Sequence, residues 1–159
     1  MDAGKRPDQL DSPLVAKFIK IGSRLNTRLY RATGGRLGGT WRVGAALRKP
    51  APVCLLTTTG RKSGQPRTAP LIYLLDGDRF VVVASQGGLP HHPAWYLNLR
   101  EHPEVTIEIG SERHDLVART ASADEKTALW PRLIDLYADF DTYDAWTERE
   151  IPVVICEPR

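Results

Sequence analysis

Residues 53–75 decide the fold, and they read VCLLTTT over 53–59, GRKSGQP over 60–66 and RTAPLIYLL over 67–75. The two outer segments are rich in β-branched and apolar residues, which favour strands. The middle segment carries the Gly, Ser and Pro residues that are typical of turns. The stretch therefore predicts an antiparallel hairpin with a basic tip, and we expect the folded body to begin near Val53.

The hairpin is expected to continue into a larger antiparallel sheet. The DGD sequence at 76–78 is a tight-turn signal, and it leads into a third strand over 79–85. Alternating and β-branched runs predict three more strands, over 105–109, 113–121 and 152–156. Six short strands without a βαβ rhythm predict an α+β, mainly β, fold built on a small antiparallel barrel.

Helices are expected before and between these strands. Capping residues and prolines predict helices over 13–31, 93–100 and 123–140, with one or two further helical turns over 141–148. Glycines then separate the first helix from Trp41, and we expect a short turn of structure over 41–47. We divide the chain into an N-terminal amphipathic helix with a Gly-rich linker (1–40) and a body (41–159).

Length and composition fit one globular unit. The 159 residues are 42% hydrophobic and 26% charged, which argues against a disordered or fibrous protein. No apolar run approaches the roughly 18 to 20 residues of a spanning helix, and no secretory signal follows the charged start. Cys54 and Cys156 are flanked by apolar residues, so we expect reduced core thiols rather than a disulfide or zinc site, which suits a reducing cytoplasm.

The charge is distributed unevenly along the chain. The formal net charge is +3, yet the stretch from Ser12 to Leu75 contains no Asp or Glu. Its basic residues are Lys17, Lys20, Arg24, Arg28, Arg31, Arg36, Arg42, Arg48, Lys49, Arg61, Lys62 and Arg67. Such a one-sided charge attracts phosphates, carboxylates, nucleic acid or an anionic membrane leaflet.

The predicted first helix carries two stripes at helical spacing. The apolar stripe consists of Leu14, Phe18, Ile21, Leu25 and Leu29, and the basic stripe of Lys17, Lys20, Arg24, Arg28 and Arg31. Two interpretations stay open. The helix packs on the body with a solvated charged flank, or it docks on an anionic membrane surface.

The hairpin tip has the chemistry of a phosphate site. Residues 60–67 contain three cations, a hydroxyl and two glycines, and glycines let backbone N–H groups approach an anion closely. A solvated basic turn is the alternative. The tip is not a Walker loop, because no GxxxxGK[ST] sequence occurs.

Two other groups suggest a binding slot. The third strand ends in Ser85 and glycines, and Trp95 and Tyr96 follow on a helix; these aromatics line a slot or anchor the core. Tyr137, Phe140 and Tyr143 recur every third residue, which suits a pocket wall or core packing. We expect no metal site at His91-His92 and no hydrolase chemistry, since there is no GxSxG sequence.

Several segments together resemble the deazaflavin (coenzyme F420)-dependent nitroreductase family of actinobacteria. They are LLTTTGRKSGQPR (55–67), ASQGG (84–88) and PAWYLNL (93–99), and the likeness extends to SPL (12–14), LGGT (37–40) and the end of the chain (146–154). The resemblance implies a split β-barrel and coenzyme F420 as hydride donor. This 8-hydroxy-5-deazaflavin carries an anionic phosphate and oligoglutamate tail, which accounts for the basic half of the chain.

The resemblance also implies site residues. The tip residues Arg61, Lys62, Ser63 and Arg67 would hold the phosphate and tail. The ring system would lie along Thr68, Ala69, Pro70, Leu71 and Ile72, and against Val83, Ala84, Ser85, Gln86, Ala94, Trp95, Tyr96, Leu97, Asn98 and Phe140. Ser85, Tyr137 and Tyr143 would act at the reacting centre.

The implied function is hydride transfer from reduced F420 to a quinone-like or other electron-poor small molecule, including nitro compounds. Nitroreductase-type members carry tyrosine at the positions of Ile72 and Phe140, so hydrogen bonding to the acceptor is expected to differ here. The alternatives are an FMN-binding split-barrel oxidoreductase and a non-catalytic protein that binds F420 or another anion. We expect a cytoplasmic monomer or homodimer that binds no nucleic acid, and peripheral contact with the inner membrane face stays open as the second interpretation of the first helix.

Overall fold

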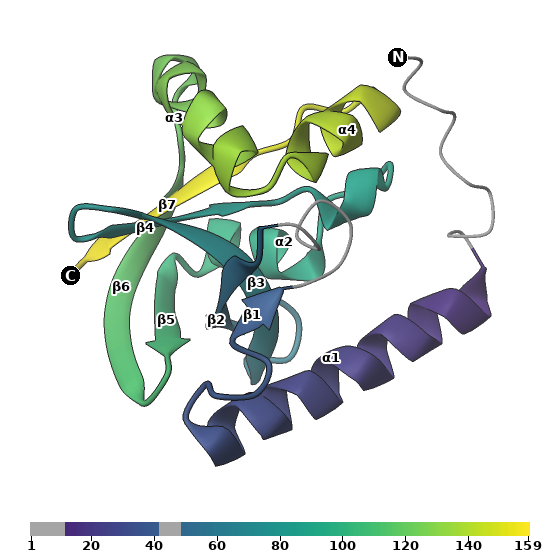
Figure 1. The fold of residues 1–159 in the computed structure, drawn as a ribbon, viewed down its shortest axis with the longest axis vertical. Helices are drawn as coiled ribbons and strands as arrows, with labels where there is room; N and C mark the ends of the chain where they lie inside the picture. The colour runs from purple at the N-terminus through teal and green to yellow at the C-terminus, as the bar shows by residue number, and fades with distance from the viewer. Residues whose placement is uncertain (1–11, 42–48) are drawn as a thin grey trace.

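The computed structural model describes residues 12–41 and 49–159 (Figure 1). Its elements are α1 (Pro13–Thr33), β1 (Thr40–Trp41), β2 (Ala51–Thr59), β3 (Pro66–Asp76), β4 (Arg79–Val83), the 3₁₀ turn η3 (Gln86–Gly88), α2 (Ala94–Glu101), β5 (Glu104–Ile109), β6 (Glu112–Thr120), α3 (Ala123–Leu136), α4 (Asp139–Trp146) and β7 (Val153–Pro158).

Six antiparallel strands form a closed barrel, as the sequence predicts. Their order is β2-β3-β4-β7-β6-β5, and the barrel closes where Leu55–Thr57 of β2 pair with Thr106–Glu108 of β5. A seventh strand, β1, pairs with the first residues of β2. The sequence did not predict β1, and β2 begins at Ala51, two residues before the predicted strand, because Pro52 is tolerated at this sheet edge.

The predicted hairpin is β2 and β3. Its register runs from Val53 opposite Ile72 to Thr59 opposite Pro66. At the tip, the Gly60 N–H donates to the Gln65 carbonyl oxygen at 2.8 Å. Gly64 adopts a φ of +70°, a left-handed conformation that glycine adopts without strain. The tip is therefore a compact turn with its basic side chains on the surface.

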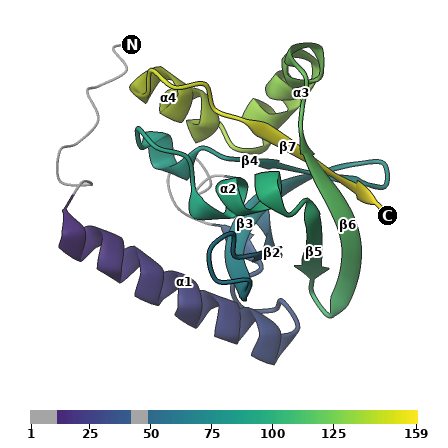
Figure 2. The same ribbon diagram turned by 180° about the vertical axis from the view of Figure 1, so that it is seen from behind.

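Two apolar clusters lie on opposite faces of the strands, because side chains alternate along a strand. Val82 and Ala84 belong to the cluster inside the barrel, whereas Val81 and Val83 face a second cluster beneath α3 and α4. Figure 2 shows these two helices together on one side of the barrel.

Cys54 and Cys156 are free, buried thiols of the interior cluster, as expected, and burial raises the pKa of Cys156 to about 12.

The predicted long helix over 123–140 is two helices. Ser122 begins α3 with a capping box, in which its hydroxyl accepts from the Glu125 N–H and the Glu125 carboxylate accepts from the Ser122 N–H. Pro131 lies within α3 and does not end it. The helix ends at Tyr137, which adopts extended backbone (φ −151°, ψ 98°).

The predicted third strand also ends earlier than expected, at Val83, because Ser85 has helical dihedral angles (φ −76°, ψ −37°).

Helix α1 packs against β3 through its last turns, and its N-terminal part extends past the barrel (Figure 1). Tyr30 is 1% exposed; its hydroxyl accepts from the Gly110 N–H at 2.8 Å and donates to the Glu108 carbonyl oxygen at 3.3 Å. The predicted apolar stripe faces away from the body, with Phe18 73% and Leu25 57% exposed. Contact with the body therefore uses Tyr30, which belongs to neither predicted stripe, and Arg31, the last member of the basic stripe, which pairs with Glu108 at 2.8 Å.

We expect Tyr30→Phe to lower the free energy of unfolding by about 1 to 2 kcal/mol, since it leaves the Gly110 N–H without its partner. Urea denaturation followed by circular dichroism measures the loss. Tyr73→Phe is the matched control, because the Tyr73 hydroxyl bonds to no other described residue. Equal losses in both variants would contradict the anchoring role of Tyr30.

Candidate functional site

The hairpin tip is tied to α2 through Asn98. The Asn98 Oδ1 accepts from the Arg61 N–H at 3.1 Å and from Arg61 Nη1 at 3.3 Å, and its Nδ2 donates to Thr58 Oγ1 at 3.2 Å. Asn98 is 4% exposed, so its amide positions the tip from beneath. Ser63 Oγ accepts from the Gln65 N–H and from Arg67 Nη2. The predicted phosphate-binding residues therefore lie together on one pre-formed turn.

The cations of the tip are free of carboxylates. Within the described part of the chain, Arg61, Lys62 and Arg67 form no ion pair, whereas Arg79 and Arg119 are paired with carboxylates. Lys62 and Arg67 are exposed. Unpaired cations on a rigid turn keep their full capacity to bind an external anion.

The predicted ring-binding run over 68–72 does not lie on one face. Ala69 and Leu71 turn toward the barrel interior, whereas Ile72 packs against the outer cluster. Thr68 faces outward, where its Oγ1 lies 2.8 Å from Thr57 Oγ1 and accepts from Arg31 Nη2 at 3.4 Å. A ligand on the outer face of β3 contacts alternate side chains of this run and reaches Ala69 and Leu71 only through the backbone.

The α2 aromatics serve the core. Trp95 and Tyr96 both belong to the interior cluster, which confirms the alternative that they are core anchors. The Tyr96 hydroxyl also lies 2.9 Å from Thr120 Oγ1. Of their predicted neighbours, Leu97 is half-buried against the same cluster and Ala94 is exposed. Cofactor contacts of α2 stay a prediction.

The Ser85 loop presents a free hydroxyl. Ser85 is 7% exposed, and its hydroxyl bonds to no other described residue. Gln86 follows with a φ of +44°, a left-handed conformation that is rare for a residue with a side chain. Its Oε1 is buried without a hydrogen-bond partner in the described structure, as is Nε1 of Trp146. The loop therefore has unfilled hydrogen-bonding capacity.

The two predicted tyrosines meet. The Tyr137 and Tyr143 hydroxyl oxygens lie 3.2 Å apart, and Tyr137 also accepts from Nε1 of Trp41 at 3.3 Å. Phe140 packs edge-on against Tyr137 with ring centroids 5.1 Å apart, and it is buried in the outer cluster. Burial raises the pKa of both tyrosines, so both hydroxyls keep their protons near neutral pH.

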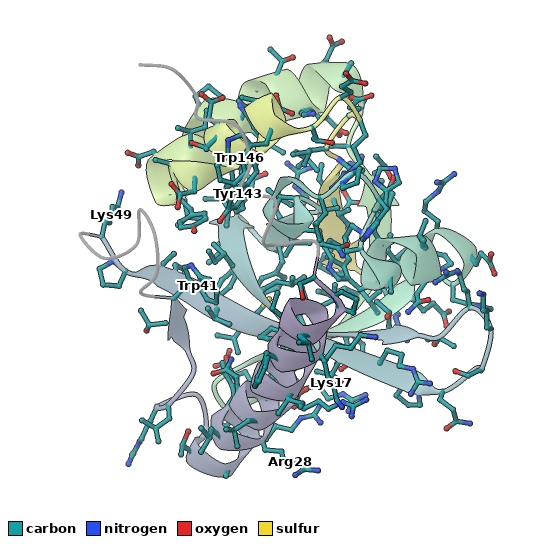
Figure 3. All side chains as sticks on the ribbon, turned by 90° about the vertical axis from the view of Figure 1, so that its right-hand side faces the viewer. Lys17, Arg28, Trp41, Lys49, Tyr143 and Trp146 are labelled. Atoms are coloured by element: carbon teal, nitrogen blue, oxygen red, sulfur yellow. The ribbon has the colours of Figure 1, made fainter. Side chains whose placement is uncertain are left out.

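The loop and the tyrosines are brought together where η3 packs against α4. Gly88 has a φ of +75°, and a Cβ there would lie 3.0 Å from the Tyr143 carbonyl oxygen and 3.2 Å from Cβ of Trp146. Only glycine permits this approach. Figure 3 shows Trp41, Tyr143 and Trp146 on the same side of the molecule. Ser85 directly precedes η3 and Tyr143 lies on α4, so the packing of these two elements brings segments that are distant in sequence together.

Three residues of this region escaped the sequence analysis. Trp41 was assigned to a short turn over 41–47, of which residues 42–47 lie outside the described residues, and its bond to Tyr137 depends on the unpredicted strand β1. Trp146 packs on Tyr143 with ring centroids 5.7 Å apart; its recurrence three residues after Tyr143 was the available signal. Arg149 lies between Glu148 and Glu150, a sequence typical of a solvated surface, and nothing local marks it as partly buried.

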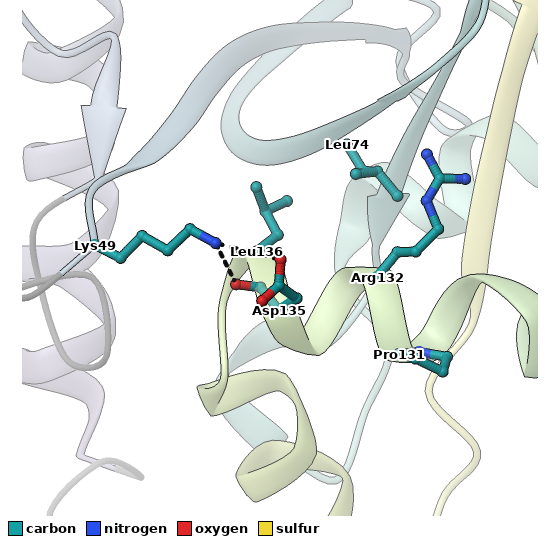
Figure 4. A pocket seen from close by; sticks show the side chains of 6 residues that line it. All are labelled: Lys49, Leu74, Pro131, Arg132, Asp135 and Leu136. Carbon is teal, nitrogen blue, oxygen red and sulfur yellow. Dashed lines mark hydrogen bonds and ion pairs between the residues drawn. The ribbon is translucent and has the colours of Figure 1, made fainter.

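Two cavities lie away from these residues. One, of about 340 Å³, lies between β3 and α3 and is lined by Lys49, Leu74, Pro131, Arg132, Asp135 and Leu136 (Figure 4). Its charged groups are paired, since Lys49 bonds to Asp135 at 3.3 Å and Arg132 to Asp76 at 2.8 Å. The other, of about 600 Å³, opens beside Tyr73 and His114. Neither cavity is lined by a predicted site residue.

Residues 12–41 and 49–159 contain neither a metal-ligand cluster nor a helix that could span a membrane. No group of three His, Cys, Asp or Glu side chains there is arranged to hold a metal ion. No helix in that part of the chain has the length and hydropathy to cross a membrane.

The sequence is similar to that of a family of redox enzymes. The family described as F420H(2)-dependent quinone reductase matches residues 22–158. The F420H(2)-dependent quinone reductase Rv1261c of Mycobacterium tuberculosis (strain ATCC 25618 / H37Rv) is 39% identical over 139 residues, which cover 86% of this chain and 89% of that protein. Rv3178 of the same strain, named provisionally as an enzyme of this kind, is 50% identical over 118 residues, which cover 74% of this chain and 99% of that protein.

Solved structures show the same likeness. An F420-H2 dependent reductase, FDR-A, has 37% identity and a TM-score of 0.62 over 67% of this chain and 94% of that one. A second structure with 37% identity, described as a domain-swapped dimer, has a TM-score of 0.63 and covers 67% of this chain and 80% of that one. The heme storage protein HutZ from Vibrio cholerae, at 15% identity and a TM-score of 0.53 over 67% and 81%, shares the fold.

Proposed function

This chain belongs to the F420H(2)-dependent quinone reductase family, and from that premise we propose that its reaction centre lies between the Ser85 loop and the Tyr137–Tyr143 pair. It is an oxidoreductase that moves a hydride from reduced coenzyme F420 to a quinone. The observation that carries the placement is the packing of η3, which directly follows Ser85, against α4, which carries Tyr143.

The residues present fit coenzyme F420. Its phosphate and carboxylates need cations without carboxylate partners, and Arg61, Lys62 and Arg67 supply them on one turn. Its ring edges need hydrogen-bonding groups, and Gln86 Oε1 and Trp146 Nε1 are buried without partners in the described structure. The tip would hold the anionic end and the loop the ring end.

Bound coenzyme F420 supplies the hydride itself. This chain must hold the quinone against it, exclude water and stabilise the negative charge that forms on the quinone oxygen. The Ser85 hydroxyl donates a hydrogen bond to that oxygen, and the Tyr143 hydroxyl donates a second one. Tyr137 orients Tyr143 through the 3.2 Å contact between their hydroxyls. The protonated tyrosines act as donors because burial raises their pKa.

An anaerobic assay tests this function. Purified protein with reduced F420 and menadione should oxidise the cofactor at a rate that saturates with menadione. No acceptor-dependent oxidation across a panel of quinones would contradict it. A bound yellow flavin in the purified protein would instead favour the FMN alternative, and saturable F420 binding without turnover would favour a binding protein.

Nitro compounds are a second acceptor class, which we expect this enzyme to reduce more slowly than quinones. Ile72 and Phe140 carry no hydroxyl where nitroreductase-type members have tyrosine. Phe140 is also buried in the outer cluster. A nitroimidazole in the same assay should therefore react more slowly than menadione.

We further propose that the apolar stripe of α1 docks on an anionic membrane, where quinones reside. Its five members, Leu14, Phe18, Ile21, Leu25 and Leu29, are 41–73% exposed. The exposed cations Lys17, Lys20 and Arg24 flank them and form no ion pair within the described structure. An apolar face with a basic flank suits insertion between anionic headgroups.

The double variant Phe18→Ser/Leu25→Ser should bind phosphatidylglycerol vesicles at least 10-fold more weakly than the wild type, because each side chain contributes roughly 1.5 to 3 kcal/mol on burial. Vesicle co-sedimentation measures this loss. Leu75→Ser is the control, since Leu75 is 55% exposed on β3. Unchanged vesicle binding, with a shift from dimer to monomer in sedimentation velocity, would assign the stripe to a second copy of the chain instead.

A further inference from the structure

Arg149 uses all of its N–H donors on neutral acceptors. Nε donates to the Leu89 carbonyl oxygen at 2.8 Å, and Nη2 donates to the carbonyl oxygens of Ala84 (3.2 Å) and Ser85 (2.8 Å). Nη1 is directed at His92 Nδ1 (3.1 Å) and the Glu150 carbonyl oxygen (3.5 Å). One side chain thus joins both ends of the loop over 84–89.

The guanidinium has no counter-ion among the described residues. No carboxylate of that part of the chain lies within 4.0 Å of it. Partial burial lowers the pKa of Arg149, although arginine stays charged at any pH of interest. A surface salt bridge is therefore not the reason for its position, and its charge stays uncompensated directly behind Ser85.

The loop needs such a clamp. Gln86 is held at a φ of +44°, and left-handed non-glycine residues cost of order 1 kcal/mol or more unless the surroundings impose them. Short backbone bonds within the loop, such as Gly88 N–H to the Ser85 carbonyl at 2.9 Å, fix only part of it. Arg149 fixes the rest by binding the carbonyl oxygens of Ala84, Ser85 and Leu89.

This arrangement also sets the direction of the donors. In a trans peptide the N–H points opposite to the C=O, and no peptide of the described chain is cis. Because Arg149 binds the Ala84 and Ser85 carbonyls, the N–H groups of Ser85 and Gln86 point away from it. The same constraint fixes the backbone that carries the Ser85 hydroxyl.

We infer that Arg149 is a positioning residue of the reductase, which holds the Ser85 loop in the geometry that stabilises negative charge on the acceptor oxygen. The inference rests on the proposed placement of the reaction centre at Ser85. Arg149 touches neither cofactor nor acceptor in this role, and it acts through the loop.

His92 makes the clamp sensitive to pH. Its Nδ1 accepts from Arg149 only when it carries no proton, so the neutral ring with its proton on Nε2 is required. The charged groups facing it are Arg149 and Arg100, and Tyr96 packs edge-on at 5.0 Å. Burial, then these two cations, lower the pKa of His92 below 6.5. Its bond to the clamp is therefore fully present above pH 6.5 and lost as the pH falls through the lowered value.

The test compares Arg149→Met with Arg149→Lys. We expect Arg149→Met to reduce kcat with menadione about 100-fold while the Kd for F420, measured by fluorescence titration, changes less than 3-fold. Arg149→Lys keeps the charge and part of the hydrogen bonding and should recover about 10-fold of the loss. Arg159→Met is the control, because Arg159 likewise donates to backbone carbonyls, of Leu116 and Val105, in another part of the fold.

Two readouts separate positioning from stability and from the proposed function. Amide hydrogen exchange of residues 84–89 in cofactor-free Arg149→Met should accelerate, whether or not the wild type reduces quinones. The wild-type kcat should also fall as the pH drops through the lowered pKa of His92, and His92→Gln, which keeps an acceptor but does not titrate, should remove that fall. A folded Arg149→Met with unchanged exchange and unchanged kcat would overturn the inference, and so would equal losses in kcat and F420 affinity. An inactive wild type whose loop still loosens in the variant would instead place the failure in the proposed function.

Discussion

The double variant Lys62→Ala/Arg67→Ala should bind coenzyme F420 about 100-fold more weakly than the wild type, with little change in the free energy of unfolding. Both side chains are exposed and free of carboxylates in the described structure, so they support the fold little. Each charge-assisted hydrogen bond to a phosphate or carboxylate contributes roughly 1.5 kcal/mol or more, which is about a factor of 10. Fluorescence titration at fixed ionic strength measures the affinity.

Arg36→Ala is the control for this variant, because Arg36 is an exposed cation outside the tip. It should change the affinity by less than 2-fold. An equal loss in both variants would mean that general positive potential, and not the tip, holds the cofactor. No loss in either would remove the tip from the binding site.

Ser85→Ala should lower kcat with menadione by about 100-fold while leaving F420 affinity within 3-fold. Removing one preorganised donor from a site of developing negative charge costs roughly 100- to 1,000-fold in other enzymes. The Ser85 hydroxyl bonds to no described residue, so its loss leaves no protein group unpaired and the variant should fold normally. Stopped-flow oxidation of bound cofactor isolates the chemical step.

Ser111→Ala, on the exposed turn between β5 and β6, is the matched serine deletion. It should leave both constants unchanged. Ser85→Ala that raises KM for menadione without lowering kcat would assign Ser85 to uniform binding of the acceptor rather than to stabilisation of the transition state.

Local patterns predicted the parts of the fold that depend on local physics. The hairpin over 53–75 follows from strand propensity on either side of a Gly-Ser-Pro turn, and the structure contains this hairpin as β2 and β3. The helix over 13–31 follows from its stripes, and α1 extends only two residues further. Contacts between segments distant in sequence were not predictable in this way. The closure of β2 on β5 and the two residues of β1 depend on such contacts.

The site residues divide in the same way, into those that local sequence predicts and those that depend on contacts between distant segments. The residues of the tip could be predicted because their chemistry is concentrated within eight consecutive positions. Arg149 could not be predicted, because its role depends on hydrogen bonds to four backbone carbonyl oxygens and the His92 imidazole, which meet it only in the folded chain. The apolar stripe of α1 had two open interpretations, and its exposure shows that its hydrophobic pattern does not form part of the described core.

The position of β7 has a consequence for how the chain folds. Val153–Pro158 lies between β4 and β6 and pairs with both, so the strands made earlier cannot form a closed ring without it. Long-range strand pairing of this kind is slow and exposes unpaired edges until it is complete. During synthesis, the sheet therefore stays open and aggregation-prone until β7 has left the ribosome.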